Sequence, residues 1–260
     1  MSEKLKTVIV PLLPMREEIV FPGKTATFFV GRQSSMDALD RSLSGDREIF
    51  VVTQRDSSVE NPKENDLYEI GVLGSVIQVM RLPNGTVKAL FEGSRRGKLL
   101  ATKLDEKEYL AQVQPLDESG LKYEHEEIED QAKKLRDLFK KYADQRKIKL
   151  GKDALKSLKE LDSMNLSDMI ASLLKIPNEQ KQKLLETLNP GIRLQKVLNI
   201  LRDEMKIKQL ENKLKKEASD KFSDTKKEDF LHDQLRNIQK ELGQMDDPKA
   251  EMDEIAEQIK

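Results

Sequence analysis

The chain has 260 residues, of which 37% are hydrophobic and 36% are charged, so it can bury a core and still cover its surface with ions of both signs. Its 46 basic and 47 acidic side chains nearly cancel, so no long-range field draws it to nucleic acid or to an anionic membrane. No apolar run approaches the length of a membrane span, the apolar part of its start is too short for a secretory signal, and cysteine is absent. These features exclude disulfides and thiolate metal sites, and they indicate a soluble cytoplasmic protein without a membrane partner.

Residues 1–116 have the pattern of a β-rich domain. Short segments rich in Val, Ile and Phe alternate there with turn residues, and they cover 8–13, 25–30, 48–53, 68–79, 86–91, 99–104 and 109–113. Asn84-Gly85 lies between two of them and favours a tight hairpin turn. One helix is expected to start at Ser34, with Asp37 completing a capping box, and to end at Gly45. The simplest assembly is this helix against a strongly bent antiparallel sheet.

A polar linker at 117–121 leads into residues 122–246, which predict a bundle of four or five helices. The first helix is marked by apolar residues at steps of four and three: Ile128, Ala132, Leu135, Phe139 and Tyr142. Shorter helical stripes follow at 153–161, 167–176 and 178–188. Residues 247–260 have the pattern of a further helix whose apolar stripe has no partner, so the chain is expected to be truncated there.

The last helix of the bundle is predicted over 190–246, with Asn189 as its cap and Pro190 at its first position. Leu194, Val197, Leu198 and Leu201 form its first apolar stripe. A continuous helix of this length would extend about 84 Å at about 1.5 Å per residue, so we expect it to project from its domain. Poor helix propensity at 219–227 predicts a kink or hinge.

A second apolar stripe near the end of this helix predicts a coiled-coil contact with another subunit or module. Its residues, the candidate assembly and tethering residues, are Leu231, Leu235, Ile238, Leu242 and Met245.

Several segments carry a resemblance to a known family. Residues 230–243 resemble the segment that joins the amino-terminal domain of the ATP-dependent protease Lon to its ATPase module. Further segments match the Lon amino-terminal domain in order and spacing, at 13–23, 29–32, 49–56, 65–71 and 80–93. The chain is therefore similar to the amino-terminal region of a bacterial Lon protease of the LonA type. The resemblance implies an α+β fold, in which a PUA-like antiparallel β-barrel with one short helix precedes an α-helical bundle that ends in a long projecting helix.

The same resemblance implies a non-catalytic region of an ATP-dependent serine protease that recognises substrates and tethers subunits into a hexamer. Its partners would be unfolded or degron-bearing proteins and other subunits of the same protein. ATP and Mg would act in an ATPase module, and the chain contains no GxxxxGK[ST] loop that could cradle a phosphate. We therefore expect no cofactor in this chain.

Residues with potential chemistry give no catalytic site. His125 lies among glutamates and His232 stands alone, so surface ion pairs are favoured over metal binding, and no serine or acid is arranged with either histidine. Ser94-Arg95-Arg96 is a denser basic patch. It leaves open the alternative of an RNA-binding PUA-like module, beside that of a free-standing holdase-like protein.

Apolar residues at turns are the candidate substrate-binding residues. They lie in one loop and one hairpin, at Ile19, Val20, Phe21 and Pro22 and at Met80, Leu82 and Pro83. Grouped on the surface, they would form an apolar patch that takes the side chains of an unfolded polypeptide. The alternative for the loop is that it folds back over the mouth of the barrel.

Overall fold

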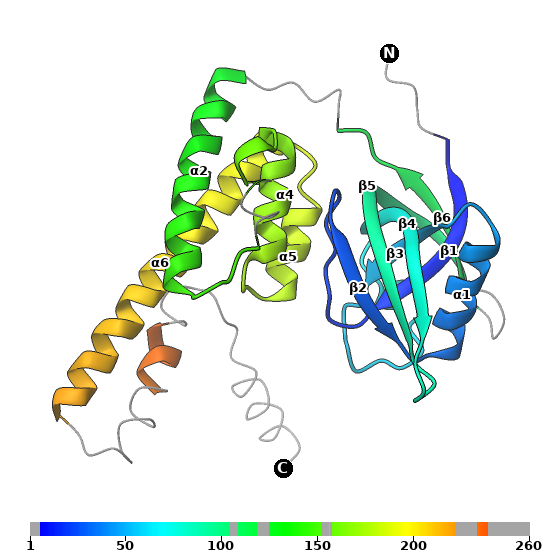
Figure 1. Cartoon of the computed structure of the whole chain (residues 1–260), viewed down its shortest axis with the longest axis horizontal. Helices are drawn as coiled ribbons and strands as arrows, with labels where there is room; N and C mark the ends of the chain where they lie inside the picture. Colours follow the sequence, from blue (N-terminus) through cyan, green and yellow to red (C-terminus); the bar gives the residue numbers. More distant parts are fainter. Residues whose placement is uncertain are drawn as a thin grey trace, which may run out of the picture. The chain divides into compact units, whose positions relative to one another are not determined.

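The computed structural model describes residues 6–104, 109–118, 125–151, 156, 158–221 and 233–238 (Figure 1). Its contacts divide the chain into two compact units, one of Met1–Phe139 with Leu150–Leu198 and one of Lys140–Lys149 with Asn199–Lys260. The first unit holds the strands together with helices between residues 150 and 198. The domain boundary predicted at 117–121 stays a prediction.

Six strands form one sheet: β1 (Val8–Met15), β2 (Thr25–Val30), β3 (Glu48–Thr53), β4 (Ile70–Arg81), β5 (Val87–Leu104) and β6 (Tyr109–Pro115). Their order is β2-β5-β4-β3-β1-β6, and a further pairing of β5 with β6 closes the sheet into a barrel. Strand β5 does this because it is long: its first part pairs with β2 and β4, and its last part with β6.

The sheet is mixed, so the prediction of a purely antiparallel barrel is wrong in one strand pair. β1 and β3 run parallel, with Leu12 opposite Phe50. Parallel neighbours need a crossover connection, and here β2 and helix α1 (Gln33–Ser44) lie between β1 and β3 in the chain. The segments predicted at 86–91 and 99–104 are one strand, β5, because the glycine- and arginine-rich stretch between them stays in the ladder.

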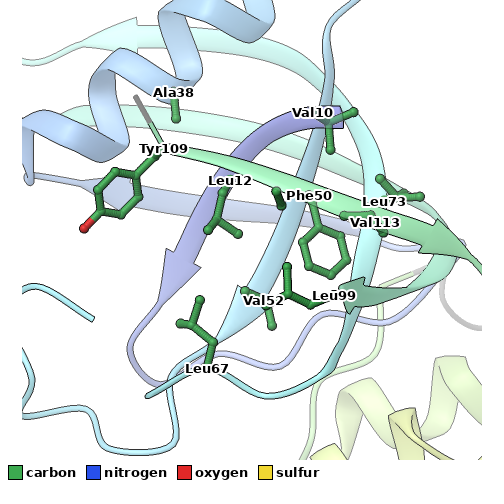
Figure 2. Packing of buried hydrophobic residues seen from close by; sticks show 11 residues of the cluster. Val10, Leu12, Ala38, Phe50, Val52, Leu67, Leu73, Leu99, Tyr109 and Val113 are labelled. Atoms are coloured by element: carbon green, nitrogen blue, oxygen red, sulfur yellow. The ribbon is translucent and has the colours of Figure 1, made fainter. Parts of the chain in front are cut away.

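Successive side chains of a strand point to opposite faces, and those that point inward form the barrel core. Figure 2 shows residues of β1, β3, β4, β5 and β6 converging there, including Leu12 of β1, Phe50 of β3 and Val113 of β6. α1 packs on the barrel and contributes the buried Ala38 to this cluster. Each Val, Leu or Phe side chain of this cluster contributes roughly 1.5–3 kcal/mol when it is fully buried.

The predicted hairpin and the end of α1 are confirmed, and the predicted start of α1 is wrong. Gly85 has φ +81°, and Leu82 and Thr86 are joined by a backbone hydrogen bond of 2.9 Å across the turn. Gly45 follows the end of α1. α1 begins at Gln33 without a side-chain cap, so Ser34 lies inside the helix and forms no capping box with Asp37, which instead accepts a hydrogen bond from the Gln33 side chain.

The later helices are α2 (His125–Gln145), α4 (Ser163–Leu173), α5 (Asn178–Leu185) and α6 (Pro190–Lys221). The five residues of the predicted α2 stripe are all buried. α4 starts earlier than predicted because Asp162 caps it by accepting a hydrogen bond from the Asn165 amide. The predicted start of α6 is confirmed, since Asn189 Oδ1 accepts from the Ile192 amide at 3.1 Å.

Within the described residues, no helix is both long and apolar enough to span a bilayer. Of the helix predicted over 190–246, the structure describes α6 to Lys221 and a short helical segment at 233–238. The remainder, with most of the predicted kink at 219–227 and the segment 247–260, lies outside the described residues.

Candidate functional site

The loop at 19–22 belongs to the core, so its predicted exposure is wrong. Ile19, Val20, Phe21 and Pro22 are all buried, with Phe21 0% exposed. Both ends of the loop are fixed by hydrogen bonds: the Thr53 hydroxyl donates to the carbonyl of Glu18 at 2.6 Å, and the Gly23 amide donates to the carbonyl of Gly93 at 2.8 Å. The loop thus folds back onto the barrel, which is the alternative that the sequence left open.

Gly93 explains why the loop can approach so closely. A Cβ atom at this position would lie 2.9 Å from the carbonyl oxygen of Phe21 and 2.9 Å from Val72 Cγ1. Only glycine leaves room for both contacts. The burial of residues 19–22 therefore depends on a residue some 70 positions later in the chain, which no local pattern reveals.

The hairpin residues of the predicted patch do reach the surface. Met80 is 50% exposed, Pro83 is exposed, and Leu82 is half-buried. Whether they bind substrate stays a prediction.

A second large apolar side chain lies in the same cross-strand row as Met80. Met80 of β4 is opposite Lys88 of β5, which is opposite Phe29 of β2. Phe29 is 68% exposed. Neighbouring strands lie about 4.8 Å apart, so Phe29 and Met80 are about 10 Å apart across the sheet, and the aliphatic stem of Lys88 lies between them. We call Met80, Lys88 and Phe29 the outer row.

Sequence reasoning missed Phe29, although a signal for it is present. Successive residues of a strand point to opposite faces, so Phe28 and Phe29 cannot both be inside the barrel. Phe28 is buried and stacks on Phe91, with ring centroids 5.8 Å apart. Phe29 must therefore lie outside.

A groove of about 710 Å³ adjoins the outer row. One wall is β2 and the residues after it, 27–32, and the other is the end of β1 and the residues after it, 13–18. Arg32 lines this groove and donates through Nη2 to Gln54 Oε1 at 2.6 Å, whereas its Nη1 is buried without a hydrogen-bond partner among the described residues. Burial is the main reason that the pKa of Arg32 lies below its ordinary value, and the nearby charge of Arg16 lowers it further.

The predicted basic patch is wrong, because Arg96 is a core residue. Arg96 is 1% exposed and is held by Asp168 at 2.6 Å, by Glu118 at 2.7 Å and by the carbonyl of Leu185 at 2.7 Å. Burial alone would lower the pKa of Arg96, but Asp168 and Glu118 together raise it above its ordinary value. Arg95 pairs with Glu48 at 3.2 Å. The predicted patch is thus reduced to one exposed arginine, Arg95, that is already paired with a carboxylate.

The same carboxylates hold a second buried arginine. Arg193 of α6 contacts Glu118 at 3.0 Å and Asp168 at 3.0 Å. This buried ion network thus joins β5 to α4, to α6 and to the segment after β6, all within the first unit. Its charges balance, so it is a structural junction and not a ligand site.

The remaining candidates are not placed in a site. The side chain of His125 and the whole of His232 lie outside the described residues, as do Leu231, Leu242 and Met245. Leu235 and Ile238 are half-buried in the segment 233–238. Their tethering role stays a prediction. Across the part of the chain that the structure describes, no three His, Cys, Asp or Glu side chains are grouped as metal ligands.

Solved structures show what kind of domain this fold is. The N-terminal domain of a Mycobacterium avium complex Lon protease matches 75% of this chain and 99% of its own, with a TM-score of 0.62 and 20% identity. A Lon N-terminal domain protein from Xanthomonas campestris matches 74% of this chain with a TM-score of 0.52 and 16% identity. The α+β fold is thus that of Lon N-terminal domains, as expected.

Sequence comparison gives the family. Residues 9–203 match the model of the ATP-dependent protease La (LON) substrate-binding domain. The chain is 35% identical over 98% of its length to Lon protease 1 of Syntrophobacter fumaroxidans, and 38% identical over 97% to Lon protease of Endomicrobium trichonymphae. The chain belongs to the LON substrate-binding domain family. It spans 31% of the length of each of these two relatives.

Proposed function

We propose that this chain captures unfolded or degron-bearing polypeptides, without catalysing a reaction, and holds them for the ATPase and protease modules of a Lon protease. The observation that supports this function is the exposed outer row beside an open groove. An unfolded polypeptide exposes the apolar side chains that such a surface takes, whereas a folded protein buries them. The flexible Met80 side chain adapts to varied partners.

The proposal includes the setting of this activity. The protein works in the cytoplasm, its other partners are further subunits of the same protein in a hexamer, and ATP and Mg serve the ATPase module and not this chain. The chain on its own therefore hydrolyses neither ATP nor peptides. Residues 94–96 do not support the RNA-binding alternative, because Arg96 is enclosed in the buried ion network.

The test is a double substitution in the outer row, Phe29→Glu with Met80→Glu. We expect the affinity for a fluorescently labelled, permanently unfolded protein to fall at least about tenfold in fluorescence anisotropy, because each apolar side chain loses its burial against the substrate. Thermal unfolding should shift by only a few degrees, since both residues lie on the surface.

Ile9→Glu is the matched control, because Ile9 is an equally exposed apolar residue on the outer face of β1, outside the outer row. It should leave the affinity unchanged. Undiminished binding by the double variant would contradict the proposal, as would an equal loss in the control.

A further inference from the structure

We propose that the free edge of β2 binds an extended segment of the polypeptide substrate as an additional β-strand, seated in the groove between β2 and residues 13–18. This inference rests on the proposed function and specifies how the captured chain is held. Its basis is the position of β2, which pairs with β5 on one side and, among the described strands, with none on the other. The barrel closes through the pairing of β5 with β6, so β2 is left as an edge.

The direction of the backbone groups of β2 follows from contacts at its start. The Gly93 amide donates to the carbonyl of Lys24 at 2.9 Å, so the backbone carbonyl of Lys24 points toward β5. In an antiparallel pair the backbone groups of successive residues alternate in direction. The backbone N–H and C=O groups of Ala26, Phe28 and Val30 therefore also point toward β5. Thr25, Thr27 and Phe29 therefore point their N–H and C=O groups away from it.

An independent contact on the other side of β5 agrees with this alternation. The carbonyl of Glu92 faces β4, since a Cβ atom on Gly74 would lie 2.1 Å from its oxygen. The neighbouring Phe91 must then face β2, where it is opposite Ala26. Within the described chain, the outward backbone groups of Thr25, Thr27 and Phe29 have no hydrogen-bond partner.

This edge also lacks the devices that usually protect an edge strand. Natural edges carry proline, charge or inward-pointing ions that prevent pairing with another chain. The six residues of β2, TATFFV, contain neither proline nor charge. An unpaired edge next to a groove suits strand addition, in which main-chain hydrogen bonds give affinity and alternate side chains give specificity.

The surroundings of the edge define the occupant. A strand added at Phe29 extends the outer row by one position, so an apolar side chain there packs against the exposed ring of Phe29. The residues before and after it point into the groove, toward the wall that contains Leu13 and Met15. The occupant therefore carries an apolar side chain at the position beside Phe29.

Charge at one end of the groove refines this description. Arg16 and Arg32 line it together with Glu17 and Glu18. Even so, Arg16 forms no ion pair among the described residues, and Arg32 Nη1 has no hydrogen-bond partner there. An acidic side chain or a carboxyl terminus at this end would form charge-assisted hydrogen bonds with both guanidinium groups. The favoured occupant is an extended apolar segment with an acidic group next to Arg32. An unfolded or flexible polypeptide offers such a segment, because its backbone groups are not held in a ladder of its own.

Backbone methylation of the bound peptide tests this mode with the unaltered chain. A decapeptide that binds the chain is first selected from overlapping segments of an unfolded model protein. Two versions are then made, with N-methyl groups on its odd-numbered or on its even-numbered residues. Strand addition predicts that one version loses affinity at least about tenfold, because its amides face β2, and that the other retains most of its affinity.

A variant pair tests the edge of the protein itself. Thr27→Pro removes an amide that faces away from β5, so it spares the ladder, as proline does on edge strands. We expect this variant to bind the decapeptide with an affinity lower by about tenfold or more. Thr27→Val keeps the amide, so it should keep the affinity of the parent chain. On binding, the amides of Thr27 and Phe29 should become protected from hydrogen exchange in the parent chain.

The outcomes separate this inference from the proposed function. Equal affinity of the two methylated peptides, or peptide binding without protection of Thr27 and Phe29, overturns strand addition even if the outer-row variant still loses unfolded protein. A chain that binds no unfolded protein at all overturns the proposed function. If Thr27→Pro fails to fold, the methylated peptides and the exchange data still decide the matter.

Discussion

Asp168 lies between two buried guanidinium groups, those of Arg96 and Arg193, and Glu118 is the second carboxylate that neutralises them. Charges removed from water in this way are tolerated only while they are paired and hydrogen-bonded. Asp168→Asn should therefore lower the free energy of unfolding by about 3–5 kcal/mol, because it leaves two buried cations with one carboxylate. Urea unfolding followed by circular dichroism measures the change.

The exposed ion pair between Arg95 and Glu48 is the control for this prediction. Glu48→Gln removes one carboxylate from a pair that is open to water, so it should cost less than about 1 kcal/mol. If Asp168→Asn proved as mild as this control, the network would not be the junction that its burial indicates.

Phe21 and Phe29, which are close in sequence, give a second comparison at this scale. Phe21 is 0% exposed and Phe29 is 68% exposed. Phe21→Ala should lower the free energy of unfolding by about 3–5 kcal/mol, because it opens a cavity in the core. Phe29→Ala should change it by less than about 0.5 kcal/mol. Similar losses in both variants, measured by the same urea titration, would show that Phe29 is packed in solution and not free to meet a substrate.

Among the elements, the strands that depend on local pattern were predictable and those that depend on distant residues were not. β2 and β3 have the predicted bounds, since both are short apolar runs between turn residues. β5 was predicted as two strands because Gly93 to Gly97 resembles a loop, yet the ladder with β4 holds this stretch in place. The parallel pairing of β1 with β3 is a long-range feature that results from the crossover through α1.

The candidate site divides in the same way. The exposure of Met80 follows from its position beside the Asn84-Gly85 turn, and the sequence predicted it. The burial of Phe21 depends on Gly93, and the burial of Arg96 depends on Asp168 in α4. Both partners are remote in sequence, so neither burial could be predicted locally. The free edge of β2 is likewise a property of the strand order, which the sequence pattern does not contain.

At the scale of the whole molecule, the stripe of Leu231, Leu235, Ile238, Leu242 and Met245 is the feature that concerns assembly. A helix that keeps one apolar face in water is marginal, because most helical stability in proteins comes from packing that face. A partner helix along a seam of alternating four- and three-residue steps would bury each leucine, for roughly 1.5–3 kcal/mol when burial is complete. We therefore expect the chain to self-associate through this stripe.

Leu235→Asp with Leu242→Asp should abolish that assembly, since two carboxylates in an apolar seam must either lose hydration or separate the helices. Sedimentation velocity on the parent chain and the double variant measures it, with Ile192→Asp, an exposed apolar position at the start of α6, as the control that should still assemble. The barrel should stay folded, because no strand residue is altered. A monomeric parent chain whose amides after 230 are strongly protected from hydrogen exchange would contradict the prediction, because the stripe would then be covered by its own chain and would be unavailable to tether another subunit.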